Sequence, residues 1–162
     1  MIVARRAGRR WRRVPILCAV VIVAACRPGG APSVVAPPAV APPAALLGDF
    51  TDDYGGRYTI TRERLTHGER SVYRIVEWHV AEQFLIAQNA ETNPAHAGSW
   101  TRIDWLPFSD QGPFTWGYCF TVYDAPTREA ARAATAADRR SPRSGCNGFP
   151  FSRMQRVPDG GA

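Results

Sequence analysis

Residues 114–123 read Phe-Thr-Trp-Gly-Tyr-Cys-Phe-Thr-Val-Tyr, and this stretch decides the fold class. Its large apolar side chains recur at every second position, so an extended chain places them on one face. They are Phe114, Trp116, Tyr118, Phe120 and Val122. Cys119 falls on the opposite face. Alternation of this kind, built from aromatic and β-branched residues, predicts a β-strand with one buried face.

Stretches closer to the N-terminus carry the same signal. They are 57–61, 72–80, 84–89 and 100–106. In the longest of them the even positions share one face: Val72, Arg74, Val76, Trp78 and Val80. Short turns separate neighbouring stretches, so an antiparallel meander of five or six strands is the economical topology. The many aromatic residues favour a small barrel or half-barrel, which gives a mainly β fold.

A change of pattern after the last strand predicts one short C-terminal α-helix. Asp124 is a candidate N-cap, Pro126 suits the first turn, and 129–137 is rich in alanine. A Ser-Pro pair then ends the helix. The following segment, 145–151, returns the chain to the sheet. Two of its side chains are expected to fill the core: Phe149 and Phe151.

Cys119 and Cys146 are expected to form one disulfide. Cys18 and Cys26 belong to the N-terminal export segment, which leaves two cysteines in a domain expected to reach an oxidising compartment. Closing a loop of about 27 residues would stabilise the fold by roughly 3 kcal/mol. Free thiols and a cysteine-based active centre are the alternatives, and neither has a supporting motif.

Residues 1–25 have the organisation of an export signal. Six arginines precede an apolar run over 14–25, which is too short to cross a bilayer as a helix. The run ends in Val-Ala-Ala-Cys at Cys26, which resembles the lipobox of bacterial lipoproteins. That resemblance implies cleavage before Cys26, its modification by acyl chains such as palmitate, and a stable membrane anchor. An ordinary secretory signal and the twin-arginine export route are the alternatives.

The mature chain is expected to consist of a tether, one domain and a tail. Residues 26–45 hold the lipidated cysteine and a Pro/Ala-rich spacer. Residues 46–156 hold the barrel-like domain, and 157–162 form a flexible tail. Arg27 stands where an aspartate would retain a lipoprotein at the inner membrane. We therefore expect the protein at the outer membrane. The sequence does not distinguish the periplasmic face of that membrane from the cell-surface face.

The precursor's net charge of +6 belongs to the export segment. Six of the 20 basic residues lie there and all 14 acidic residues follow it, so the mature chain carries 14 charges of each sign. A neutral chain argues against a nucleic-acid partner. The mature chain keeps one local cluster of basic residues near its C-terminus. Three arginines in a loop are typical of a solvent-exposed face. These are Arg139, Arg140 and Arg143.

Four short motifs stand out in the domain. They are Ile-Ala-Gln-Asn at 86–89, Asp-Trp at 104–105, Tyr-Cys at 118–119 and Gly-Cys-Asn-Gly-Phe at 145–149. Together they resemble a group of uncharacterised bacterial lipoproteins and exported proteins of myxobacterial type. The resemblance implies an exported protein with paired cysteines and implies no particular activity. Gly-Asp-Phe at 48–50 is also faintly similar to the start of lipocalins, which implies architecture and not a ligand.

Few residues could carry chemistry. The three histidines, His67, His79 and His96, lack the spacing of a metal site, and no cofactor motif is present. Glu77 and His79 share a strand face and are more typical of a polar pair on a sheet than of metal ligands.

Arg102 and Asp104 project to the same side of their expected strand. With Gln88 they predict a polar network inside the barrel, which would fix the register of the strands. Alternatively, five residues line a pocket for a small ligand or a glycan, because such pockets combine aromatic walls with a few polar groups. The five are Gln88, Arg102, Asp104, Trp105 and Tyr118.

Two functions fit these observations. We expect a cell-envelope protein, anchored to the membrane through Cys26, that is a non-catalytic binding or structural module for a small ligand, a glycan or an envelope protein. No residue is assigned a catalytic role in that interpretation. The alternative is an envelope hydrolase or modifying enzyme that uses Glu77, His79 or Asp104 as acid or base.

Overall fold

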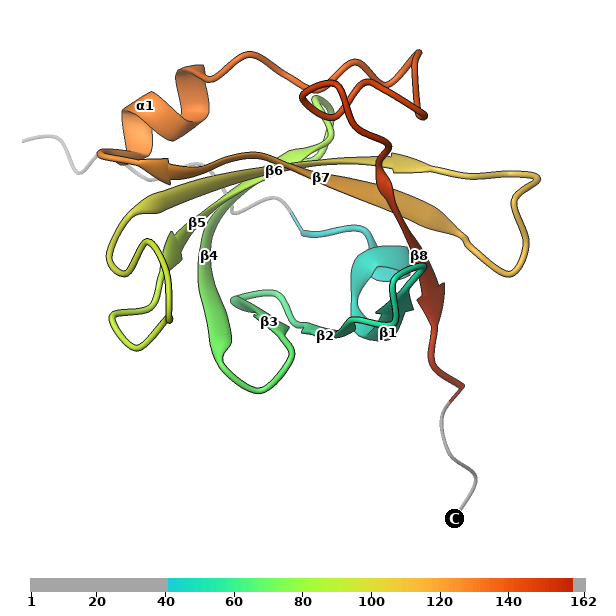
Figure 1. Cartoon of the computed structure of the whole chain (residues 1–162), viewed down its shortest axis with the longest axis horizontal. Coiled ribbons are helices and arrows are strands. Elements are labelled where there is room, and N and C mark those ends of the chain that lie inside the picture. Colours follow the sequence, from blue (N-terminus) through green and yellow to red (C-terminus); the bar gives the residue numbers. More distant parts are fainter. Residues whose placement is uncertain (1–40, 159–162) are drawn as a thin grey trace, which may run out of the picture. The chain divides into compact units, whose positions relative to one another are not determined.

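The computed structural model describes residues 41–158, which form a closed β-barrel with one short α-helix (Figure 1). The strands are β1 (Gly48–Asp52), β2 (Arg57–Ile60), β3 (Arg64–His67), β4 (Ser71–His79), β5 (Phe84–Asn89), β6 (Trp100–Pro107), β7 (Trp116–Ala125) and β8 (Ser152–Arg156). A 3₁₀ turn, η1 (Ala44–Leu46), precedes β1, and helix α1 (Arg128–Ala133) lies between β7 and β8. The expected signal peptide, Cys26, most of the tether and residues 159–162 lie outside the described residues.

Each strand pairs antiparallel with the next, and β8 pairs with β1 to close the barrel. The predicted mainly β fold, its meander order and its short C-terminal helix are confirmed. The expected number of strands, five or six, is wrong because β1, β3 and β8 also form. These strands have only four or five residues each. At that length an alternating pattern is hard to recognise, and pairing with both neighbours determines the strand.

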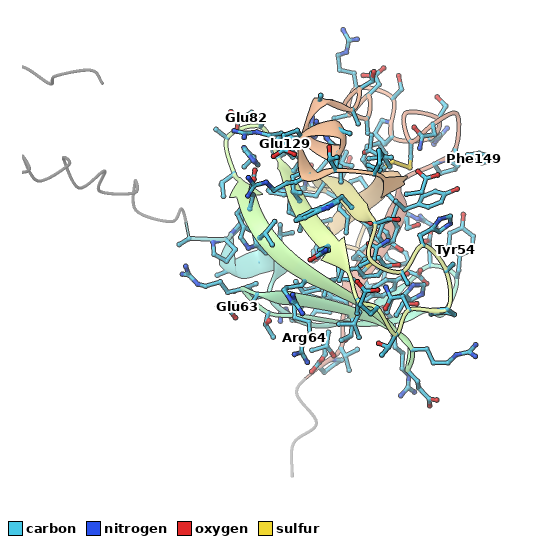
Figure 2. All side chains as sticks on the ribbon, turned by 90° about the vertical axis from the view of Figure 1, so that its left-hand side faces the viewer. Tyr54, Glu63, Arg64, Glu82, Glu129 and Phe149 are labelled. Atoms are coloured by element: carbon cyan, nitrogen blue, oxygen red, sulfur yellow. A yellow bond between two sulfur atoms is a disulfide. The ribbon has the colours of Figure 1, made fainter. Side chains whose placement is uncertain are left out.

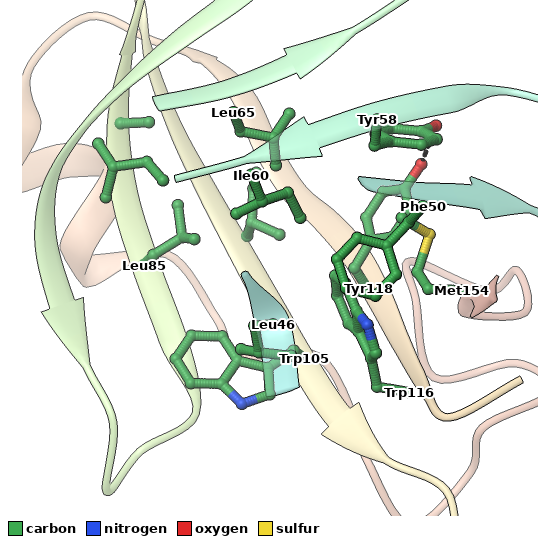
Figure 3. Packing of buried hydrophobic residues seen from close by; sticks show 13 residues of the cluster. Leu46, Phe50, Tyr58, Ile60, Leu65, Leu85, Trp105, Trp116, Tyr118 and Met154 are labelled. Carbon is green, nitrogen blue, oxygen red and sulfur yellow. Dashed lines mark hydrogen bonds between the residues drawn. The ribbon is translucent and has the colours of Figure 1, made fainter. Parts of the chain in front are cut away.

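Side chains of the protein itself fill the barrel interior (Figure 3). The rings of Phe50 and Trp116 meet edge to face with centroids 5.4 Å apart, and those of Trp78 and Trp105 lie 5.8 Å apart. Leu46, from the turn before β1, packs against the same cluster. The space left among these side chains is about 10 Å³, roughly the limit for one water molecule. As residues 41–158 are packed in this structure, the interior holds no open cavity of ligand size.

Shifts of register in the β4–β5 and β6–β7 pairs change the strand faces that the alternating pattern predicted. The register of β4 shifts just after Ile75, so Ile75 and Trp78 both pack against the interior cluster while Val76 is exposed. In β7, register shifts against β6 leave Phe120 on the interior cluster and Val122 on the outer cluster beneath α1. The expectation that each stretch keeps one face along its whole length was wrong, because an extra residue in one strand turns the following side chains over.

Helix α1 covers the outer face of β5, β6 and β7 (Figure 1). Its N-cap is Thr127 and not the expected Asp124. The helix ends at Ala133, earlier than the alanine-rich stretch 129–137 predicted. At that end, Arg102 Nη1 donates hydrogen bonds to two carbonyl oxygens, each at 3.0 Å. A side chain from the sheet therefore satisfies main-chain acceptors that a longer helix would have used.

The predicted disulfide between Cys119 and Cys146 is present and ties the segment after α1 to β7. The pairing of β8 with β7 extends only to Tyr118, so the rest of β7 has no β8 partner. Asn147 covers the start of that unpaired side. Its side-chain amide donates to the carbonyl oxygens of the next two β7 residues after Cys119, at 3.3 Å and 3.2 Å.

The two phenylalanines of the return segment have different environments. Phe151 is 1% exposed, as expected for a core residue, whereas Phe149 is 71% exposed. Main-chain hydrogen bonds of 2.9 Å and 2.8 Å between Cys146 and Phe149 form a tight turn that precedes β8. The prediction that Phe149 fills the core was wrong, because this turn places it on the surface.

The chain is already packed against the barrel before Leu46. Pro42 is buried, and Arg156 Nη2 donates to the carbonyl oxygens of Leu47 at 2.7 Å and Ala45 at 3.4 Å. These bonds hold the entering chain beside the end of β8. Within residues 41–158, no helix combines the length and the apolar character that a membrane span requires.

Candidate ligand-binding cleft

The five residues expected to line one pocket do not converge. Trp105 and Tyr118 are buried inside the barrel. Arg102 and Asp104 lie on the opposite, outer face of β6, where the segment after α1 covers them. Gln88 is half-buried and its amide donates to Gly98 O at 3.4 Å. A single pocket using all five would have to cross the wall of the barrel.

Asp104 is the centre of a buried ion cluster on the outer face of the barrel. Its side chain is 0% exposed and accepts hydrogen bonds from Arg102 Nε at 2.9 Å, Arg102 Nη2 at 3.1 Å and Arg139 Nη2 at 2.6 Å. The hydroxyl of Thr121 donates to the same carboxylate. The Arg102 guanidinium also lies 3.9 Å from the centroid of the Phe84 ring. A carboxylate without access to water requires charged donors of this kind.

Arg139 extends the ion cluster to the main chain. It donates to the carbonyl oxygens of Trp105 at 2.9 Å, Glu82 at 2.8 Å and Gln83 at 2.7 Å. Together with the bonds from Arg102 to the end of α1, these contacts join the α1 segment, β6 and the turn between β4 and β5. The cluster therefore holds helix α1 and the segment after it on the outer face of the barrel. The polar network was expected inside the barrel, and this cluster lies outside it.

Glu77 and His79, the other candidate acid and base, are neighbours on the outer face of β4. Glu77 Oε2 lies 2.6 Å from His79 Nε2, and Glu77 Oε1 lies 3.5 Å from Arg128 Nε of α1. The His79 ring stacks on Phe84 with centroids 4.1 Å apart. Each of the two polar groups therefore has protein partners, and the pair helps to dock α1 on β4.

Two tyrosine hydroxyls meet at one end of the barrel interior. Tyr58 Oη and Tyr118 Oη are 2.5 Å apart (Figure 3), and Tyr58 also donates to Asp52 Oδ2 at 2.9 Å. Burial raises the pKa of Tyr118 to about 12. Burial, with Tyr118 as the next cause, raises the pKa of Tyr58 still further. Both hydroxyls are therefore protonated at neutral pH and act as hydrogen-bonding groups of the core.

An open cleft of about 950 Å³ lies on the outside of the barrel, and we call it the outer cleft. Its walls come from the turn after β1, the loop between β6 and β7, the segment between α1 and β8, and β8 itself. The polar and rim residues used below are Asp53, Tyr54, Asp110, Arg140, Arg143 and Arg153. A volume of this size is within the range of sites for small molecules.

The floor of the outer cleft is aromatic and depends on one glycine. Phe108 and Phe151 line the cleft and pack over Gly117 of β7. A Cβ atom at Gly117 would lie 2.9 Å from Phe108 Cζ and 3.3 Å from Phe151 Cβ, so a side chain there would displace the floor. Phe114 adds a third ring, and the guanidinium of Arg153 lies 4.5 Å from its centroid.

The walls of the outer cleft carry charges of both signs with one more guanidinium than carboxylate. Arg153 Nε and Asp53 Oδ2 form an ion pair at 2.9 Å, so these two charges compensate each other. The Arg140 side chain is 93% exposed. No carboxylate within residues 41–158 forms an ion pair with Arg143, which is also exposed. Asp110 is the remaining charged group of the lining.

Hydrogen bonds hold the loop that carries Arg140 and Arg143. Asp138 accepts from Arg140 N at 3.1 Å and from Ser141 Oγ at 3.0 Å, while its own N–H donates to Gly145 O at 2.9 Å. The hydrogen bond from Ser141, with those from Arg140, lowers the pKa of Asp138, so this carboxylate stays ionised. The disulfide closes the same loop onto β7. The two guanidinium groups therefore extend from a preformed support.

A smaller hollow of about 230 Å³ lies beside the loop between β5 and β6. Tyr73, Phe120, His96 and Tyr123 line it, and the rings of His96 and Tyr123 lie 4.9 Å apart. Its described lining includes no arginine and no carboxylate, so it offers fewer oriented polar groups than the outer cleft. In the described part of the chain, no three His, Cys, Asp or Glu side chains are grouped as metal ligands would be.

The outer cleft was not predicted from the sequence. Its walls come from turns around 53–54, 108–114 and 140–151, and no spacing motif links stretches so far apart. The available signal was weak: Arg140 and Arg143 were interpreted as a solvated face, which is the usual meaning of such a group.

Comparisons of this chain with protein-family models, with curated proteins and with solved structures found no match.

Proposed function

We propose that this protein is a lipid-anchored module of the cell envelope that binds a ligand in the outer cleft and catalyses no reaction. The observation that carries the proposal is the contrast between a filled barrel interior and a preformed cleft of about 950 Å³ on the outside. Aromatic surface beside a few fixed polar groups is the usual composition of a binding site.

The positions of the candidate catalytic groups support binding over catalysis. Asp104 is enclosed by two arginines, and Glu77 and His79 help to hold α1. None of the three lines the outer cleft, whose described lining also contains no histidine. An envelope hydrolase that uses one of these groups remains the second candidate, supported by the direct contact between Glu77 and His79.

The envelope location and the anchor are proposed from the N-terminal sequence. An arginine-rich segment, a short apolar run and the lipobox-like end at Cys26 fit a lipoprotein signal. Arg27 after the anchor favours the outer membrane. The Pro/Ala-rich stretch that follows suits a spacer between lipid and domain.

Native mass spectrometry of the full chain taken from its own envelope tests the proposed function. We expect a co-purifying molecule with the wild-type chain and its loss from Ser144→Trp, which places a bulky ring in the cleft lining. Thr92→Trp, in an exposed loop away from the cleft, is the matched control and should retain the molecule. A co-purifying molecule that is unaffected by Ser144→Trp would contradict the site. An enzymatic activity abolished by Glu77→Gln with the fold retained would favour the second candidate.

A further inference from the structure

We infer that the ligand of the outer cleft is an acidic glycan, meaning a sugar chain that carries carboxylate or phosphate groups. This inference rests on the proposed binding function of the cleft. It depends on three features of the lining: an exposed aromatic ring, guanidinium groups without a full complement of partners, and hydrogen-bonding groups suited to hydroxyls.

One exposed aromatic ring lines the outer cleft, and a second belongs to a residue that is adjacent in the sequence to a lining residue. Tyr54 lines the cleft and is 76% exposed, and Phe149, which directly precedes the lining residue Pro150, is 71% exposed (Figure 2). The backbone of Tyr54 is fixed, because its N–H donates to Asp52 Oδ1 at 3.0 Å. The negative face of an aromatic ring attracts the polarised C–H groups on a sugar face. Single rings on rigid turns therefore suit a sugar chain better than they suit a broad apolar partner.

The guanidinium groups of Arg140 and Arg143 supply the preference for negative charge. Both are exposed, they lie three residues apart on the hydrogen-bonded loop, and Arg140 has only a solvent-exposed ion pair at 3.2 Å with Asp138. A guanidinium binds a carboxylate or a phosphate through two parallel hydrogen bonds. Arg153 is already paired with Asp53, so two of the three arginines in the lining remain to bind an anion.

The rest of the lining suits the hydroxyl groups of a sugar. Ser144 and Gln111 offer side-chain donors and acceptors, and Asp110 offers an acceptor. Sugar hydroxyls both donate and accept, so a lining with both types satisfies them. One carboxylate among the arginines also limits the attraction for a simple polyanion.

A protein partner fits the outer cleft less well. Aspartate is depleted in the buried part of protein interfaces, whereas Asp53 and Asp110 both line this cleft. Binding by addition of a strand requires a free sheet edge, and the part of β7 that extends beyond β8 does not line the outer cleft. The charge excess of the lining, one guanidinium, is small for a nucleic acid.

Isothermal titration calorimetry of the full chain in detergent micelles tests the inference. The probes are hexagalacturonate and mannohexaose 6-phosphate as acidic oligosaccharides, maltohexaose as a neutral one and hexaglutamate as an acidic peptide. We expect binding of at least one acidic oligosaccharide, with maltohexaose and hexaglutamate at least tenfold weaker. Arg140→Ala and Arg143→Ala should each weaken that binding about tenfold, as loss of a charged hydrogen bond does.

The matched controls are Arg62→Ala, in the turn between β2 and β3, and Arg64→Ala, at the start of β3; both remove exposed arginines outside the cleft. They should bind like the wild type, and thermal denaturation should show that all four variants are folded. Equal binding of maltohexaose or hexaglutamate, no binding of either acidic oligosaccharide, or full binding by both cleft variants would overturn the inference. A neutral or peptidic molecule that co-purifies and is lost from Ser144→Trp would overturn the acidic glycan while leaving the proposed binding function intact.

Discussion

Asp104 holds helix α1 and the segment after it on the barrel through its ion pairs with Arg102 and Arg139. Replacing it by asparagine leaves Arg102 buried without a counter-charge and weakens the hold on Arg139. Because removing one partner of a buried ion pair is strongly destabilising, Asp104→Asn should lower the free energy of unfolding by about 3–5 kcal/mol. Urea denaturation followed by circular dichroism measures this change.

Asp124→Asn is the matched control for Asp104→Asn. It makes the same chemical change at an exposed position and should leave the denaturation midpoint nearly unchanged. Equal effects of the two substitutions would show that the ion cluster contributes little to stability.

Tyr118 makes stability depend on alkaline pH. Its pKa is raised from 10.0 to about 12 in the folded chain, so between these values the unfolded chain releases a proton that the folded chain keeps. Stability contributed by the raised pKa is present below pH 10 and is lost as pH rises toward 12. It amounts to about 2–3 kcal/mol over that interval. Tyr58 acts in the same direction, because its pKa is also raised.

Urea denaturation at a series of pH values between 8 and about 12 checks this dependence. The free energy of unfolding should fall above pH 10 in the wild type and fall less steeply in Tyr118→Phe. Tyr54→Phe removes an exposed hydroxyl and should keep the wild-type slope. An unaltered slope in Tyr118→Phe would contradict the role of this residue.

Among the elements, the segment between α1 and β8 depends on the disulfide. Cys146→Ser opens a loop of about 27 residues, which should lower the free energy of unfolding by roughly 3 kcal/mol and lower the melting temperature. Differential scanning calorimetry with and without a reductant measures the effect. The reductant should lower the melting temperature of the wild type and leave Cys146→Ser unchanged. A wild type that melts at the same temperature under reducing conditions would contradict this stabilisation.

The long elements could be predicted from the sequence, and the short ones could not. The strands β5, β6 and β7 are six to ten residues long and carry several large apolar or aromatic side chains each, so their patterns can be recognised. In contrast, β1, β3 and β8 have four or five residues and only one buried side chain each, and β1 and β8 gain their conformation from pairing with each other across the length of the domain. The register shifts in the β4–β5 and β6–β7 pairs were also beyond prediction, since the pairing of two strands decides where an extra residue is accommodated.

At the scale of the whole molecule, the candidate site was harder to predict from the sequence than the fold was. The disulfide was predicted by counting the cysteines that lie outside the expected export segment. The outer cleft joins turns near residues 53, 110, 142 and 152, which only closure of the barrel brings together. No sequence motif marks the outer cleft. Gly117, for example, leaves room for Phe108 and Phe151, which are far from each other in the sequence.

The proposed anchor predicts how the whole protein is distributed in the cell. The Cys26→Ser variant of the full chain should take up no radiolabelled palmitate and should move from the membrane fraction to the soluble fraction, because it lacks the sulfur that carries the lipid. Cys18→Ser is the matched control and should remain labelled and membrane-bound. Labelling that persists in Cys26→Ser would contradict the lipobox interpretation.

The amide of Asn147 also bears on how copies of this domain meet at high concentration. It occupies the carbonyl oxygens of Phe120 and Thr121, where β7 extends beyond β8, and the adjacent disulfide keeps it there. Without that cover, a strand of a neighbouring copy could pair with the bare main chain and start aggregation. We therefore expect the disulfide to act in two ways: it stabilises each molecule, and it hinders edge-to-edge association by keeping Asn147 in place.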